Sequence, residues 1–262
     1  MTKTYESITV ERVAQTEWIT FQRTKQMNAL SSQMLDETAS ALDVAMQDDA
    51  VRVIAITGSG RAFCAGADLK EVAGTTIAPG ERNMLDRVDS VFGTLRNGPK
   101  PVIAVVNGLA MAGGLELVMA CDLVFAAQSA KMGDAHSNFG VFPGAGGAAI
   151  LPNRIGLNRA KDLLFSGENV TSQQMMDWGL VNRVVADDDL RDAVQTYADK
   201  LSDKSPAVLR RMKTMANRAM NTDEQSALAE EMLHLLTHMR SWDMQEGLSA
   251  FAEKRKPKFR GY

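Results

Sequence analysis

The sequence predicts an α/β fold followed by a helical C-terminal region. Two short apolar runs rich in β-branched residues, at 51–57 (VRVIAIT) and 100–106 (KPVIAVV), are typical of buried strands. Stretches with apolar residues at helical spacing lie between such runs, and beyond residue 156 the helical pattern dominates. Strands that alternate with helices are expected to form a sheet covered by helices, and the later helices an appended region.

The first elements are a strand at 17–21 and a helix at about 32–47. Ser31 or Ser32 is placed to cap this helix, because a serine hydroxyl accepts hydrogen bonds from the free N–H groups of a first turn. The next strand ends at a Gly-Ser-Gly sequence at 58–60, which favours a turn.

The later elements repeat the order of helix, strand and glycine-rich turn. A polar loop at 75–80 precedes a helix at about 81–96, and the proline that follows it is tolerated at the start of a strand. The next elements are a glycine-rich turn at 107–114, a helix at 115–120 and strands at 123–126 and 130–132. Two or three helices are expected within 206–252, and the last of them covers 242–252. A basic tail follows at 254–260.

The composition limits the classes of protein to which the chain can belong. Its 262 residues, 45% of them hydrophobic, can bury a large core, and a net charge of −3 argues against a nucleic-acid or anionic-membrane binder. No apolar run approaches the roughly 20 residues of a membrane span. The two cysteines, Cys64 and Cys121, favour a reducing compartment, and no zinc-ligand spacing predicts a metal. We therefore expect a cytoplasmic protein without a metal.

Two glycine-rich segments, 58–69 and 107–117, share one design. Each follows a buried strand and ends where a helix opens, and neither has the spacing of a P-loop or a dinucleotide-binding turn. Small residues let a ligand approach the backbone, and the first N–H groups of a helix lack partners within it. Two such ends can form an oxyanion hole around a carbonyl oxygen. Taken singly, each segment is also a common turn of α/β proteins.

The order of motifs resembles the enoyl-CoA hydratase/isomerase (crotonase) superfamily from about residue 5 to residue 260. The segment 58–71 (GSGRAFCAGADLKE) resembles its first signature, and 100–122, with KPVIAVVNG, AGGLEL and CD, resembles its second. Further matches are FPGAGG at 142–147, WGLV at 178–181 and the pattern F-x-x-K-R-x-P-x-F at 251–259.

The resemblance implies a crotonase-like β-β-α spiral core at 1–200 and a C-terminal helical trimerisation region at 201–262. It further implies homotrimers or dimers of trimers. The implied substrate is an acyl-CoA thioester whose carbonyl oxygen meets the N–H groups of Ala67 and Gly113, with no cofactor besides the coenzyme A of the substrate. The residues that match CoA-contacting positions of the family are Lys25, Met27, Ala65, Ala67, Asp68, Leu69, Lys70 and Gly113. The basic tail is a further candidate for the adenine or phosphates, or a solvated end.

The resemblance also assigns the proton-transfer groups. Glu116 matches one of the two catalytic glutamates of hydratases, and counting seven residues back from Pro143 places His136 where the second would stand. Histidine titrates near neutral pH and can serve as acid or base. If the backbone is extended, Asp134 shares the face of His136 and can orient its ring. The alternatives are that Glu116 only stabilises the helix dipole and that His136 only fills the site.

The predicted reaction is reversible hydration of a 2-enoyl-CoA through a stabilised enolate, which favours a lyase over an isomerase. Glu116 would activate water for attack at C3, and His136 or Glu116 itself would protonate C2. The alternatives are double-bond isomerisation with Glu116 as the single base, and a catalytically silent CoA-thioester-binding paralogue. The candidates for the acyl pocket, which the sequence equally allows in the core, are Met84, Leu85, Val88, Met111 and Phe142.

Overall fold

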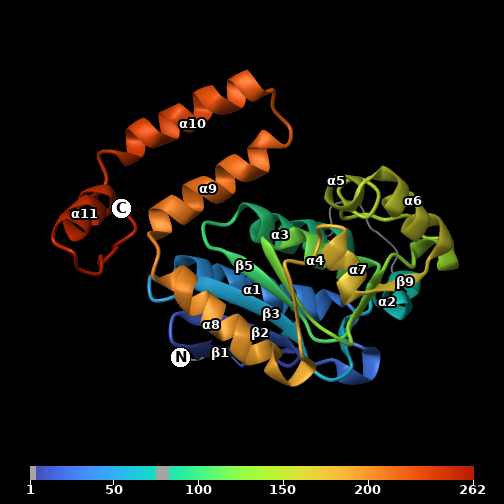
Figure 1. The fold of residues 1–262 in the computed structure, drawn as a ribbon. Helices are drawn as coiled ribbons and strands as arrows, with labels where there is room; N and C mark the ends of the chain where they lie inside the picture. Colours follow the sequence, from blue (N-terminus) through green and yellow to red (C-terminus); the bar gives the residue numbers. More distant parts are fainter. Residues whose placement is uncertain (1–3, 75–82) are drawn as a thin grey trace.

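The computed structural model describes residues 4–74 and 83–262, and a six-stranded sheet forms its centre (Figure 1). The strands in sheet order are β1 (Ile8–Val13), β2 (Thr16–Phe21), β3 (Val53–Gly58), β5 (Val102–Val106), β7 (Leu123–Ala127) and β10 (Arg183–Val185). β1 and β2 are antiparallel, whereas the strands from β2 to β10 run parallel. β3 and β5 are buried at every residue, which explains their continuous apolar runs.

A second sheet of short strands lies beside the first. Its order is β4 (Ala62–Cys64), β6 (Leu109–Met111), β8 (Lys131–Gly133) and β9 (Asn169–Thr171). The chain passes from the first sheet to the second three times, from β3 to β4, from β5 to β6 and from β7 to β8, and each passage leads into helical structure. This repetition confirms the expected β-β-α spiral core. The two glycine-rich segments are therefore not simple turns, because each contains a strand of the second sheet.

The first long helix, α1 (Ser32–Gln47), confirms the sequence-based expectation and decides its cap. Ser31 Oγ accepts a hydrogen bond from the Met34 N–H at 3.2 Å, so Ser31 caps the helix and Ser32 is its first residue. Helix α3 (Met84–Asn97) begins after Asn83, whose side chain caps it in a reciprocal capping box with Asp86. The expected loop at 75–80 and the expected helix start at 81 lie outside the described residues.

The remaining short helices connect the strands and cover the core. They are α2 (Leu69–Gly74), α4 (Gly113–Ala120), α5 (Leu151–Ile155), α6 (Leu157–Ser166), α7 (Ser172–Asp177) and α8 (Leu190–Ser202), with the 3₁₀ turns η1 (Thr24–Gln26), η2 (His136–Phe139) and η3 (Asp187–Asp189). Helix α8 packs against β2, β3, β5 and β7 of the large sheet.

Three C-terminal helices follow α8 and lie to one side of the sheets (Figure 1). They are α9 (Pro206–Ala219), α10 (Glu224–His238) and α11 (Trp242–Ala252), and the bounds of α11 match the expected 242–252. α8 ends at Ser202, so the expected domain boundary at residue 200 falls in its last turn. No helix in the ranges 4–74 and 83–262 is long and apolar enough to cross a bilayer.

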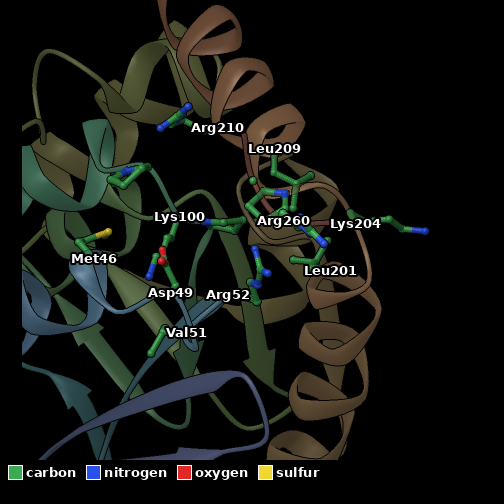
Figure 2. A pocket seen from close by; sticks show the side chains of 14 residues that line it. Met46, Asp49, Val51, Arg52, Lys100, Leu201, Lys204, Leu209, Arg210 and Arg260 are labelled. Carbon is green, nitrogen blue, oxygen red and sulfur yellow. The ribbon is translucent and has the colours of Figure 1, made fainter. Parts of the chain in front are cut away.

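The C-terminal tail folds back against the segments that lead into β3 and β5 (Figure 2). The Asp243 carboxylate, in the first turn of α11, accepts hydrogen bonds from the N–H groups of Arg260 at 2.7 Å and Gly261 at 3.1 Å. Arg260, Arg52 and Lys100 line a cavity of about 140 Å³ there. The glycine-rich segments follow the carboxyl ends of the same strands, so this basic cavity lies at the opposite end of the sheet from them.

Candidate active site

Two backbone N–H groups, those of Ala67 and Gly113, lie close together where the glycine-rich segments meet. A Cβ built on Gly113 would lie 3.5 Å from the Ala67 nitrogen. Leu30 and Ala67 form an isolated β-bridge, but its hydrogen bonds are made by the residues on either side of Ala67. Leu30 N–H donates to Gly66 O at 2.7 Å, and Asp68 N–H donates to Leu30 O at 2.8 Å. Within the described part of the chain, the N–H groups of Ala67 and Gly113 donate to no acceptor. Both are therefore available to an oxygen atom in the adjoining cavity.

A residue with positive φ precedes each of these donors. Gly66 has φ 99°, and a Cβ there would lie 3.3 Å from the Gly113 nitrogen and 3.2 Å from Met111 O. Ala112 has φ 49° and ψ −119°, although it carries a side chain, and its N–H donates to Gly133 O at 3.0 Å. Strain of this kind costs about 1–3 kcal/mol and persists only where the surrounding structure enforces it, often at functional sites.

Glu116 lies in the first turn of α4 with only 4% of its surface exposed. One carboxylate oxygen, Oε1, accepts hydrogen bonds from the N–H groups of Ala145 at 2.8 Å and Gly147 at 2.9 Å. These two bonds fix the side chain and leave Oε2 as the oxygen with reactive capacity. Both donors come from the glycine-rich 144–147 segment.

His136 faces Glu116 from the other side of the same cavity. Its Nε2 lies 4.0 Å from Glu116 Oε2. Its Nδ1 lies 2.8 and 3.0 Å from the two carboxylate oxygens of Asp134, which is completely buried. The three groups thus form a row of carboxylate, imidazole and carboxylate.

The condition of an extended backbone is not met in this segment, because His136 begins the 3₁₀ turn η2. The strand β8 ends at Gly133, and the Asp134 side chain accepts the His136 N–H at 3.1 Å, a local bond that favours turns. The expected contact between Asp134 and His136 nevertheless exists. It arises from the turn and not from the alternation of a strand.

The surroundings of His136 act on its pKa in opposite directions. Burial lowers the pKa, whereas the hydrogen bond and charge of Asp134 and the charge of Glu116 raise it. The net effect is a pKa above the usual value of a histidine. His136 therefore keeps its proton to a higher pH than an exposed histidine would.

These groups line one cavity of about 330 Å³ with a largely apolar wall. Ala67, Gly113, Glu116 and His136, the four predicted catalytic residues, all contribute to it. Met84, Leu85, Val88 and Phe142 line it as the sequence allowed, together with Leu69, Val72, Phe92 and Val141. Met111, the last residue of β6, is not among the residues that line it.

The predicted CoA-contacting residues gather on two neighbouring segments. Lys25 and Met27 lie in and directly after η1, and Ala65 N–H donates to Met27 O at 3.1 Å, which joins the two segments. Lys70 and Lys25 are exposed, and Leu69 is an exposed residue of the cavity wall.

Asp68, also predicted to contact CoA, forms an ion pair with Arg23 at 2.8 Å. The hydrogen bond from Arg23 lowers the pKa of the Asp68 carboxyl group, which therefore stays charged. Arg23 also donates to Ala29 O, and its bond to Asp68 joins the 23–29 segment to the 65–70 segment. Sequence reasoning did not assign this role to Arg23, because the pairing depends on a contact between segments distant in the chain.

Sequence reasoning also missed the support of Glu116 by the 144–147 segment. Arg96 of α3 donates to Ala145 O at 2.5 Å and lies over the Phe92 ring, while Ala145 N–H donates to Glu116. The PGAGG motif was the available signal, but only the fold shows which side chain its N–H groups meet. Among the described residues, no cluster of three His, Cys, Asp or Glu side chains is arranged for a metal.

The spiral fold, the paired N–H groups and the acid–base row define a protein of the crotonase type. A family model described as enoyl-CoA hydratase/isomerase matches residues 11–262. A probable enoyl-CoA hydratase of Mycobacterium bovis is 38% identical over 256 residues, covering 98% of each chain. A crotonyl-CoA hydratase of Syntrophomonas wolfei is 36% identical over 256 residues, covering 97% of this chain and 98% of its own.

The solved structures agree. An enoyl-CoA hydratase of Bacillus anthracis superposes with a TM-score of 0.92 at 34% sequence identity, over 98% of this chain and all of its own. The chain belongs to the enoyl-CoA hydratase/isomerase family.

Proposed function

We propose that the protein is a lyase that catalyses the reversible addition of water to a 2-enoyl-CoA. The observation that carries this proposal is the pair of proton-transfer groups: Glu116 Oε2 and His136 Nε2 lie 4.0 Å apart in the cavity that Ala67 and Gly113 line. Hydration requires one proton to be taken from water and one to be given to carbon. Two facing titratable groups suit that chemistry.

The thioester carbonyl oxygen is the group we place between the N–H groups of Ala67 and Gly113. Attack at C3 moves electron density onto this oxygen, so the two donors bind the enolate more strongly than the substrate. The loss of one such donor typically costs about 2.7–4 kcal/mol of transition-state stabilisation.

Glu116 acts as the base in this mechanism. Its Oε2 takes a proton from water as the water oxygen bonds to C3, while Oε1 remains held by Ala145 and Gly147. The enolate then collapses as C2 receives a proton from His136, or from Glu116 itself, and the 3-hydroxyacyl-CoA forms. Water has then added across the double bond with no other reactant consumed.

A Glu116→Gln substitution tests this assignment. We expect the hydration rate to fall by about 10²–10⁴-fold, because a positioned acid or base typically contributes that factor. Loss of the conjugated-thioester absorbance measures the rate on short, medium and branched 2-enoyl-CoA substrates. The exposed Glu168→Gln variant is the matched control and should retain full activity.

The same assays separate the other two functions. Conversion of a 3-enoyl-CoA into the conjugated isomer, without a hydroxyacyl product, would assign isomerisation with Glu116 as the single base. Tight binding of CoA ligands with no turnover of any substrate in the panel would assign a silent thioester-binding paralogue. Either result would overturn the hydratase proposal.

The side chains that line the cavity indicate which kind of acyl group it accepts. Its wall beyond the acid–base groups consists mainly of aliphatic and aromatic side chains from α2, α3 and the segment after η2. We propose that it accepts a hydrocarbon acyl chain, and that Lys25, Met27, Ala65, Asp68, Leu69 and Lys70 contact the coenzyme A part of the substrate. Exposed Lys25 and Lys70 suit its phosphates by charge.

The tail is less suited to this role in a single chain. Arg255 bonds to Glu246, and Arg260 lies over the Trp242 ring, while Lys256 pairs with Asp203. A contribution of the tail to a CoA site therefore stays a prediction. We also retain the prediction of a cytoplasmic protein; Cys64 and Cys121 are free and buried, as a reducing compartment allows.

A further inference from the structure

We propose that Asp134 is a positioning residue that makes His136, rather than Glu116, the proton donor to C2. The inference rests on the proposed hydration and deepens it. It assigns each proton-transfer step to one atom: Glu116 Oε2 for water, and His136 Nε2 for carbon. Asp134 touches no substrate in this scheme and acts through the imidazole ring.

Asp134 contacts both the imidazole ring and the backbone of His136. Both carboxylate oxygens lie within 3.0 Å of Nδ1, and Oδ1 also accepts the backbone N–H of His136 at 3.1 Å. A carboxylate accepts and does not donate, so Nδ1 must carry a proton in either charge state of the ring. All proton exchange of His136 is thereby confined to Nε2.

Nε2 is also the ring atom that faces the reaction. It lies 4.0 Å from Glu116 Oε2, which is too far for a direct hydrogen bond and close enough for one water to reach both atoms. A second link runs through Gly147, whose N–H donates to Glu116 Oε1. A Cβ on Gly147 would lie 2.8 Å from Asp134 Oδ2. Gly147 thus packs against Asp134 and also donates a hydrogen bond to the base, Glu116.

The charges favour His136 as the proton donor and Glu116 as the base. In this scheme an Asp134 carboxylate beside a protonated His136 forms a neutral pair with one proton to give, and the Glu116 carboxylate is the group that accepts the proton of water. Only 11% of the His136 side chain is exposed, yet the two flanking carboxylates, Asp134 and Glu116, stabilise its charged form. Asp134 and Glu116 are the titratable groups that act on it.

The protons balance over one turnover. Water gives a proton to Glu116 and its oxygen to C3, and His136 gives its Nε2 proton to C2. Glu116 is then protonated and His136 neutral. Transfer of the proton from Oε2 to Nε2, through a water that reaches both atoms across the 4.0 Å gap, restores the starting state.

An Asp134→Asn substitution tests the proposal by nuclear magnetic resonance and by kinetics. An asparagine amide can present its N–H₂ to Nδ1 and no longer stabilises the charged ring, so we expect a lower His136 pKa and a mixture of ring tautomers. The alkaline limb of the kcat–pH profile should shift to lower pH, and kcat should fall by about 10-fold or more. Comparison with His136→Gln assigns the His136 resonance among the three histidines.

Two further variants keep the test decisive. Asp134→Glu, which restores a carboxylate, should recover part of the His136 pKa and of kcat, and the exposed Asp162→Asn is the matched control. An unchanged His136 titration and an unchanged alkaline limb in Asp134→Asn would overturn the proposal. The resonance titration needs no turnover, so it tests Asp134 even if the wild-type protein hydrates no enoyl-CoA. Absence of hydration would contradict only the proposed function.

Discussion

At the scale of single residues, the site depends on backbone conformations that few side chains tolerate. Gly66 precedes the Ala67 donor with φ 99°, and the space where its Cβ would stand is bounded by Ala112 Cβ at 3.1 Å and Gly113 N at 3.3 Å. A methyl group there would push on the second donor as well as on its own peptide. A side chain at position 66 would therefore displace both N–H groups.

A Gly66→Ala substitution should therefore impair catalysis as well as stability. Gly156→Ala is the matched control, because Gly156 has a similar φ of 89° but no atom within 4 Å of its built Cβ. Both variants carry the cost of positive φ, about 1–2 kcal/mol, and Gly66→Ala adds the cost of its close contacts, so we expect it to lose at least as much unfolding free energy in urea. Only Gly66→Ala should also turn over substrate about 10-fold or more slowly, because its donors are displaced. Equal turnover by the two variants would contradict the coupling of the donors.

At the scale of elements, the sequence pattern predicted the long or strongly apolar segments and missed most of the short ones, although it predicted the three-residue strand β8 at 130–132. Helices α1 and α11 and strands β3 and β5 have clear periodicity or a continuous apolar run, and the expected ranges overlap the observed ones. The strands β4, β6 and β9 have three residues each, too few to show a period. They form because the spiral aligns them, which is information from distant parts of the chain.

The same distinction applies to the site. Ala67, Gly113, Glu116 and His136 follow from local motifs and meet at one cavity. The roles of Arg23, Arg96 and the Ala145 and Gly147 N–H groups depend on pairings across 29 to 49 residues and leave no local pattern.

The cap of α1 provides a test at this scale. Ser31 accepts the Met34 N–H, and it directly follows Leu30, which bridges Ala67. Ser31→Ala should cost about 0.5–2 kcal/mol of unfolding free energy, measured by urea denaturation. Ser32→Ala is the matched control, because Ser32 Oγ donates or accepts no hydrogen bond among the described residues and its loss should cost less. A larger cost at Ser32 would show that the cap had been misassigned.

At the scale of the whole molecule, the C-terminal helices expose much of their apolar surface. α9 and α10 enclose an open groove of about 640 Å³ between them, and Phe251 of α11 is 85% exposed. The exposed apolar side chains of this region include Leu228, Met232, Leu233, Leu235, Leu236 and Met239. Patches of this kind mark interaction surfaces in proteins. We propose that 201–262 forms the predicted oligomerisation region and joins copies of the chain as a trimer or a dimer of trimers.

Light scattering during size-exclusion chromatography tests that assembly. We expect a mass of three or six times the 28.5 kDa of one chain. A charge at Leu236, as in Leu236→Glu, should shift the mass towards that of a single chain, because a buried unpaired charge disfavours association. Val44→Glu, at an equally exposed apolar residue on α1, should leave the mass unchanged. A wild-type protein that elutes as a single chain would contradict the proposed assembly.

The paired donors of Ala67 and Gly113 have a consequence for how such a site can change over time. They belong to the main chain, so almost any codon at positions 67 and 113 still encodes the N–H group, and only proline removes it. Glu116, Asp134 and His136 are side chains that one nucleotide change can replace. The N–H groups that hold a negative oxygen are therefore inherited with the fold as long as Gly66 keeps its conformation, while the fate of the enolate remains open to mutation of the side chains.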